Sequence, residues 1–109
     1  MNKKMDEIDF IKGGGMIPVI VQDINTKKIL TLAYSNKESL ELTKKTGNSW
    51  FWSRSRNKLW MKGEESGNTQ KVKEILVDCD SDALIYLVEP SGPACHTGEE
   101  TCFHNELEK

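Results

Sequence analysis

The sequence has few cysteines, little excess charge and no long hydrophobic run. Its 109 residues include three cysteines and carry a formal net charge of −2. No segment is apolar over the length that a bilayer span or a secretory leader needs, so we expect no membrane partner. An odd number of thiols without such a leader predicts a cytoplasmic protein and not a disulfide framework. The small negative charge excludes a bulk basic field for nucleic acid.

The length predicts one domain with a modest hydrophobic core. Hydrophobic residues make up 37% of the chain and charged residues 29%, which is ordinary for a small globular protein. We expect a polar lead-in over residues 1–9 and a folded domain over residues 10–109. Because small cores bury less of their surface, metal binding or dimerisation would add stability.

Hydrophobic patterning predicts about six strands and one clear helix. Two β-branched runs, 16–23 and 29–34, flank a polar turn and predict a hairpin. Two further apolar runs, 70–77 and 83–88, predict another pair of strands joined by a short connection. The expected fold class is α+β, predominantly β: a compact single domain with a mixed-sheet or barrel-like arrangement.

The helix is predicted from its end signals. Ser35 or Asn36 can cap its start, and Glu38 stands three residues after Ser35, as a capping box requires. Gly47 is a suitable residue to end the helix in the left-handed conformation. Leu40 is the firmest candidate for the side that faces the core.

Tryptophans and arginines alternate after the helix. As a strand, residues 49–63 would place four of these side chains on one face: Trp50, Trp52, Arg54 and Arg56. Aromatic rings stack on a nucleobase and Arg forks bind phosphate oxygens, so this face suits a nucleotide ligand. Two other interpretations stay open. One is a tryptophan core beneath solvated arginines, and the other is a nucleic-acid face, which the small number of basic residues makes weaker.

The connection between the last two predicted strands interleaves two kinds of metal ligand. Three of its residues are aspartates, namely Asp78, Asp80 and Asp82. In an extended backbone these carboxylates would share one side and Cys79 would point to the other. Carboxylates suit hard cations such as magnesium, manganese or calcium, whereas thiolates suit zinc. This segment is therefore predicted to serve two metals of different character.

The three cysteines, Cys79, Cys95 and Cys102, do not have the spacing of a zinc finger. Structural zinc usually has four protein ligands, whereas three ligands and one open position are typical of catalytic zinc, whose water has a pKa of about 7. His96 would be either a fourth ligand or a base that takes the proton from that water. The alternative is three unrelated thiols, because free cysteine often behaves as a small buried apolar residue.

Seven stretches together carry a family resemblance. They are MIPVIVQD (16–23), AYSN (33–36), WSRSR (52–56), LWMKGE (59–64), SGN (66–68), DCDSDA (78–83) and PACHTG (93–98). With these stretches in this order, the chain from about Phe10 to Phe103 resembles the phosphoribosyl-AMP cyclohydrolase family of histidine biosynthesis. Two departures are mild, because neither Ser35, where the family usually has Met, nor Thr101, where it often has Ser, is an expected ligand.

The resemblance implies a hydrolase that depends on zinc and magnesium. A zinc-activated water adds to C6 of the adenine ring of 1-(5-phosphoribosyl)-AMP, and the N1–C6 bond opens. The zinc ligands that the resemblance implies are Cys79, Cys95 and Cys102. The magnesium ligands that it implies are Asp78, Asp80 and Asp82. It also implies an intertwined homodimer whose zinc ligands come from both subunits.

The roles of the remaining candidates are our own extrapolation. His96 is expected to act as the general base, or else to be a histidine that is only hydrogen-bonded near the metal. The candidate substrate-binding residues are Trp52, Arg54, Arg56, Lys62, Ser66 and Asn68. Two other function classes stay open. One is a non-catalytic zinc-stabilised nucleotide- or RNA-binding module, and the other is a hydrolase that cleaves phosphate bonds through the aspartates alone.

Overall fold

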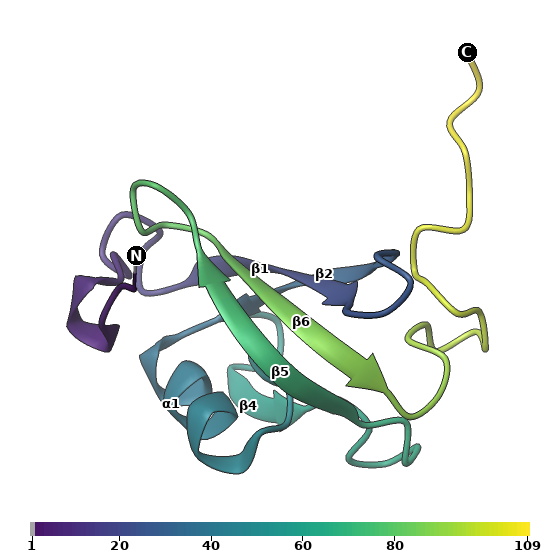
Figure 1. Cartoon of the computed structure of the whole chain (residues 1–109), viewed down its shortest axis with the longest axis horizontal. Helices are drawn as coiled ribbons and strands as arrows, with labels where there is room; N and C mark the ends of the chain where they lie inside the picture. The colour runs from purple at the N-terminus through teal and green to yellow at the C-terminus, as the bar shows by residue number, and fades with distance from the viewer. Residues whose placement is uncertain (1) are drawn as a thin grey trace.

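A computed structural model describes residues 2–109, and Figure 1 shows a sheet with one helix and a hairpin on one of its faces. In chain order the elements are a 3₁₀ helix η1 (Met5–Glu7), β1 (Ile17–Asp23), β2 (Ile29–Ser35), α1 (Lys37–Thr46), β3 (Trp50–Ser53), β4 (Lys58–Met61), β5 (Gln70–Val77) and β6 (Leu84–Pro90). The predicted α+β class, predominantly β with one α-helix, is confirmed. Within the described residues, no helix is long and apolar enough to cross a bilayer.

The four-stranded sheet has the order β2-β1-β6-β5, so its two central strands are far apart in sequence. β1 and β6 run parallel, and each pairs with its outer neighbour in the antiparallel sense. Side chains alternate along β1, so that Ile17, Val19 and Val21 are almost fully buried. Leu84 and Tyr86, which lie opposite Val19 and Val21 on β6, extend the same buried face.

The helix and the β3–β4 hairpin cover this buried face of the sheet. Leu40 of α1 is buried in the core, as predicted. Phe51 of β3 is fully buried, and its ring packs against those of Trp60 and Tyr86, with centroid distances of 5.0 Å and 5.8 Å. Such aromatic contacts add to the free energy gained from burial alone.

The ends of α1 lie where the sequence predicts them. Asn36 caps the start, because its Oδ1 accepts a hydrogen bond from Ser39 N–H at 2.8 Å and its own N–H donates to Ser39 Oγ at 2.8 Å. Gly47 ends the helix with a left-handed φ of 78°. The expected capping box of Ser35 with Glu38 is wrong, since Ser35 is the buried last residue of β2.

The segment predicted as one strand over residues 49–63 is a hairpin. β3 and β4 pair in the antiparallel sense, and residues 54–57 form the turn between them. The polar composition of this turn allows the chain to reverse, and Asn57 adopts a left-handed φ of 53°, which asparagine tolerates. Arg54 and Arg56 therefore lie in a turn and not on a strand face.

The opposite face of the sheet is also apolar. Ile20 on β1 lies opposite Leu32 on β2 and Ile85 on β6, and Ile85 lies opposite Leu76 on β5. Because cross-strand partners share a face, these four side chains form one row, which we call the apolar sheet face. Leu32 is 47% exposed and Leu76 is 44% exposed.

Candidate active site

A tight turn between β5 and β6 carries the three aspartates, and we call residues 78–83 the aspartate loop. Asp78 Oδ1 accepts hydrogen bonds from the N–H groups of Asp82 at 2.9 Å and Ala83 at 3.1 Å. Ser81 takes a left-handed φ of 63°. One carboxylate oxygen from each aspartate lies within 4.8 Å of the others. The aspartates therefore converge as predicted, although the cause is a turn and not an extended segment.

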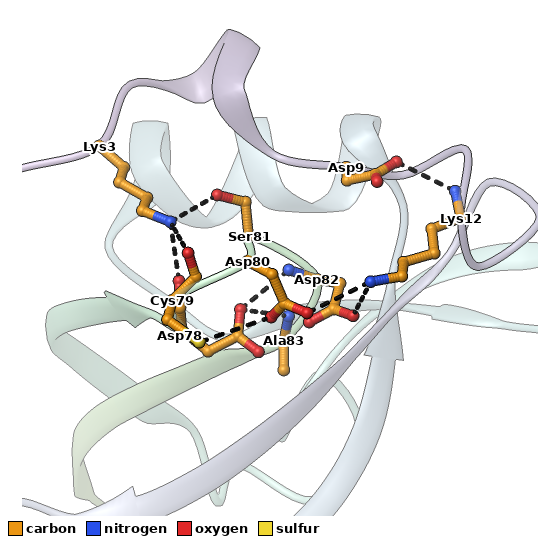
Figure 2. A network of polar contacts seen from close by, with 9 residues as sticks. All are labelled: Lys3, Asp9, Lys12, Asp78, Cys79, Asp80, Ser81, Asp82 and Ala83. Atoms are coloured by element: carbon orange, nitrogen blue, oxygen red, sulfur yellow. Dashed lines mark hydrogen bonds and ion pairs between the residues drawn. The ribbon is translucent and has the colours of Figure 1, made fainter.

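An ammonium group lies against two of these carboxylates (Figure 2). Lys12 Nζ is 3.3 Å from Asp80 Oδ2 and 2.9 Å from Asp82 Oδ2. These contacts, Asp82 first and then Asp80, raise the pKa of Lys12 above its usual value. Oxygen donors of this kind are the ligands that magnesium prefers, and the lysine marks the loop as a place that attracts a cation. The loop therefore fits magnesium.

The N-terminal segment holds the backbone of the aspartate loop from another side (Figure 2). Lys3 Nζ donates to the carbonyls of Asp78 and Cys79, both at 2.9 Å. It also donates to Ser81 Oγ at 2.7 Å. Asp9 N–H donates to the Ser81 carbonyl at 2.8 Å. The segment predicted as a lead-in thus contacts the loop through Lys3, which sequence reasoning missed because a lysine in a polar segment forms no pattern.

The other predicted ligands lie after β6, and we call residues 91–104 the cysteine loop. Cys95 is buried, and its Sγ accepts a hydrogen bond from Thr97 Oγ1 at 3.0 Å. His104 Nε2 lies 3.9 Å from the same sulfur. The Thr97 hydroxyl, then the Thr97 N–H, and then His104 and Cys102 lower the pKa of the Cys95 thiol to about 6. A thiol with this pKa is mostly thiolate at neutral pH, which is the form that binds zinc.

The two loops lie at opposite ends of β6 (Figure 1). This strand has seven residues, and at about 3.3 Å per residue they span roughly 20 Å. Cys95 and Cys102 belong to the cysteine loop, whereas Cys79 belongs to the aspartate loop. Among the described residues, the three aspartates are the only group of three or more potential metal ligands whose ligand atoms lie within 4.8 Å of one another. One chain alone therefore does not bring the three predicted zinc ligands together.

An open cavity of about 450 Å³ lies between the β3–β4 hairpin and the cysteine loop. His96, which is exposed and directly follows Cys95, lines it. Three of the predicted substrate-binding residues also line it, namely Arg56, Lys62 and Ser66. The cavity thus places a titratable ring and two cationic side chains around a volume that suits a small polar ligand.

The other predicted substrate-binding residues are not part of this lining. Trp52 is half-buried in β3. The Arg54 guanidinium lies 4.4 Å from the centre of the Tyr34 ring, which is a cation–π contact. Asn68 packs on Gly92, where an added Cβ would collide with Asn68 Oδ1. Asn68 therefore has a packing contact that explains its position without a ligand.

Sequence reasoning missed Trp60 and Glu64 as cavity residues and His104 as a neighbour of Cys95. Trp60 and Glu64 belong to a stretch that matches the family, so a signal for them was present. His104 lies in the polar C-terminal segment, where no motif singles it out.

Comparison with known proteins gives a consistent result. Residues 31–104 match the family model described as phosphoribosyl-AMP cyclohydrolase. The chain is 80% identical over 107 residues to the phosphoribosyl-AMP cyclohydrolase of Nitrosopumilus maritimus, and the matched region covers 98% of this chain and 99% of that protein. It is 62% identical over 94 residues to the phosphoribosyl-AMP cyclohydrolase of Archaeoglobus fulgidus, and the matched region covers 86% of this chain and 87% of that protein. It is also 62% identical over 104 residues to the histidine biosynthesis bifunctional protein HisIE of Bacillus subtilis, and the matched region covers 95% of this chain and 49% of that protein.

Proposed function

This chain belongs to the phosphoribosyl-AMP cyclohydrolase family, and from this premise we propose that it opens the N1–C6 bond of the adenine ring of 1-(5-phosphoribosyl)-AMP with a zinc-activated water. The chain is a hydrolase of histidine biosynthesis. Its curated relatives are named as enzymes, which counts against a non-catalytic zinc-stabilised binding module.

One observation carries the proposal for the chemistry. His96 lines the same cavity as Arg56 and Lys62, and it directly follows Cys95, whose thiol has a pKa of about 6. A candidate proton acceptor and two candidate phosphate-binding cations thus line one cavity, and a soft metal ligand is the neighbouring residue in the chain. A nucleotide with two phosphates and a reactive ring needs this combination.

Ring opening needs a nucleophilic water and a group that transfers a proton. When bound, zinc supplies a nucleophilic water near neutral pH. His96 would accept a proton that is released as a water oxygen adds to C6. The C6–N1 bond then breaks, and N1 receives the proton, so that the water is added across the bond with no other reactant. If His96 is only hydrogen-bonded near the metal, the proton passes to solvent directly.

Arg56 and Lys62 are proposed to hold the phosphates of the substrate. An Arg fork can bind two phosphate oxygens at once, which makes the contact stronger and more directional than a contact from an ammonium. Both side chains belong to the β3–β4 hairpin and the turn after it. This hairpin packs on the core through Phe51, so the phosphate contacts have a rigid base.

We propose that the zinc site is completed by two chains. The thiolate character of Cys95 and the position of Cys102 in the same loop fit zinc, but Cys79 lies about one strand length away. A homodimer in which one chain contributes Cys79 and the other contributes Cys95 and Cys102 resolves this separation. The apolar sheet face supports dimer formation, because it leaves Leu32 and Leu76 about half exposed on one surface.

This arrangement would also bring both metals to one active site. Cys79 lies within the aspartate loop, between Asp78 and Asp80. A zinc ion bound by Cys79 would therefore have the proposed magnesium ligands beside it. Magnesium favours sites where a few carboxylates meet substrate phosphates, and this substrate supplies two of them.

The proposal is tested by an absorbance assay for ring opening with and without a zinc chelator. Turnover should disappear on chelation, return on addition of zinc and not return on addition of magnesium alone. Release of inorganic phosphate in place of ring opening would instead support a hydrolase that acts on phosphate bonds through the aspartates. Full ring opening by zinc-free protein would contradict the zinc-dependent mechanism.

A further inference from the structure

We propose that Lys12 is a tethered counter-ion that occupies the aspartate loop until a divalent cation displaces it, and that it thereby weakens the affinity of the loop for magnesium. The inference rests on the proposed function for the metal role of the loop. Lys12 itself lies outside the seven stretches that carry the family resemblance and outside residues 31–104, which match the family model.

Lys12 contacts one carboxylate oxygen on each of two proposed magnesium ligands. Its Nζ lies 2.9 Å from Asp82 Oδ2 and 3.3 Å from Asp80 Oδ2. Magnesium binds carboxylate oxygens at about 2.0–2.1 Å. An ammonium and a metal ion on the same oxygens would be like charges only a few ångströms apart, and they would repel each other. The two cations therefore exclude each other from the loop.

The backbone of Lys12 is anchored on the loop that its side chain contacts (Figure 2). Lys12 N–H donates to Asp9 Oδ1 at 3.0 Å. Asp9 N–H in turn donates to the Ser81 carbonyl at 2.8 Å. Asp9 thus links the turn that carries Lys12 to the aspartate loop, which keeps the ammonium at a high local concentration beside the carboxylates.

Lys3 provides an internal contrast. It contacts the same loop, but its Nζ donates to the backbone carbonyls of Asp78 and Cys79 and to the Ser81 hydroxyl. None of these acceptors is a carboxylate oxygen. Lys3 therefore supports the backbone without competing for the proposed magnesium ligands.

The expected effect is moderate, because the contact is open to solvent. The side chain of Lys12 is 53% exposed and that of Asp80 is 57% exposed, so the ammonium can turn into water without disturbing the core. Exposed ion pairs are weak and are screened by salt. Removing the competing charge should therefore tighten divalent cation binding roughly 3- to 10-fold at low ionic strength, and much less at high ionic strength.

The experiment measures metal binding to the full-length protein with its zinc in place. Magnesium is removed by gel filtration and not by EDTA, which would also remove zinc from the thiolates. Manganese(II) is then titrated, and the free ion is followed by electron paramagnetic resonance, with magnesium added as a competitor. The test variant is Lys12→Met, and Lys12→Arg retains the charge. Lys73→Met is the matched control, because Lys73 also forms an exposed ion pair, with Glu89 at 3.2 Å on the β5–β6 pair.

The expected result is tighter manganese and magnesium binding by Lys12→Met, affinities close to wild type for Lys12→Arg and Lys73→Met, and convergence of all curves in about 0.5 M salt. Affinity that is unchanged or weaker in Lys12→Met, with wild-type protein binding manganese, would overturn the inference and leave the proposed function intact. Absence of manganese binding in both proteins would overturn the inference together with the magnesium assignment. Circular dichroism checks that each variant is folded.

Discussion

The aspartate loop and the cysteine loop lie at the two ends of β6. They differ in whether one chain alone brings all the predicted metal ligands together. The aspartate loop gathers its three carboxylates through its own backbone hydrogen bonds. The cysteine loop contains two of the three predicted zinc ligands, while the third lies in the aspartate loop. When the ligands are close in sequence, a single turn can bring them together into a metal site. When they are far apart in sequence, their meeting depends on the fold topology or on a second chain.

The two loops also stabilise their anionic groups in different ways. The aspartates face the ammonium of Lys12, which is a full charge that a metal must displace. Cys95 instead accepts a hydrogen bond from the neutral hydroxyl of Thr97. This donor favours the thiolate without placing a competing cation in the ligand position. The comparison predicts that the cysteine loop binds its metal tightly at neutral pH, whereas the aspartate loop needs a higher metal concentration to be occupied.

The largest effect is expected from loss of a thiol. Cys79→Ser and Cys95→Ser should each abolish tight zinc binding and lower turnover at least about 100-fold, because the nucleophilic water depends on the metal. Metal analysis and the ring-opening assay measure the two quantities, after circular dichroism has shown that each variant is folded. Full activity in either variant would remove that cysteine from the site.

Co-expression of these two variants tests whether the zinc site is shared between chains. In a mixed dimer, one site would combine the intact Cys95 of the first chain with the intact Cys79 of the second. Random mixing should therefore restore about one quarter of the wild-type activity. No recovery in a preparation that contains mixed dimers would show that Cys79 and Cys95 do not complement each other between chains.

A smaller effect, on the magnesium requirement of the reaction, is expected from loss of a carboxylate. Asp80→Asn and Asp82→Asn should each raise the magnesium concentration for half-maximal activity by about 10- to 100-fold, since a charged ligand is lost. The zinc content should stay near normal, because the thiols are untouched. Asp6→Asn, a change at an exposed position in η1, is the matched control. Loss of zinc together with magnesium would show that the two metals do not have separate sets of ligands.

Features that depend on neighbouring residues could be predicted from the sequence. Asn36 and Gly47 bound α1 as expected, because capping acts within one turn. The hairpin within residues 49–63 was missed, because Trp50, Trp52, Arg54 and Arg56 follow one another at every second position and this pattern resembles one long strand. Periodicity alone does not show where such a pattern reverses.

Features that depend on topology could not be predicted in this way. β1 and β6 pair in parallel although most of the chain separates them. The contact of Lys12 with the aspartate loop likewise arises from the turn before β1, and no motif marks it. The separation of Cys79 from Cys95, in contrast, follows from the strand predicted over residues 83–88, which lies between them in the chain.

A smaller effect is expected at the cavity, where the structure separates two arginines that the sequence treats alike. Arg56 lines the cavity, whereas Arg54 lies over the Tyr34 ring. Arg56→Ala should raise KM at least about 10-fold, because a lost charged hydrogen bond costs about 1.5–3 kcal/mol. Arg54→Ala should change KM less than about 3-fold. Arg56→Lys should recover part of the loss, and equal effects of both alanine variants would contradict the assignment.

The smallest effect concerns the titration of Cys95. In zinc-free protein its thiol should ionise with a pKa of about 6, below the usual value of 9.0, chiefly because the Thr97 hydroxyl donates to the sulfur. The resulting contribution to folding stability is fully present above pH 9, decreases as the pH falls and is lost below pH 6. Thr97→Val keeps the size and the N–H but removes the hydroxyl, so it should raise this pKa by about one unit, as expected for the loss of one hydrogen bond to an ionised group. Thiolate absorbance near 240 nm follows the titration, with Cys95→Ser as the control that identifies the signal. A midpoint that stays near pH 6 in Thr97→Val would show that the hydroxyl is not the main cause, and that the Thr97 N–H, His104 or Cys102 stabilises the thiolate instead.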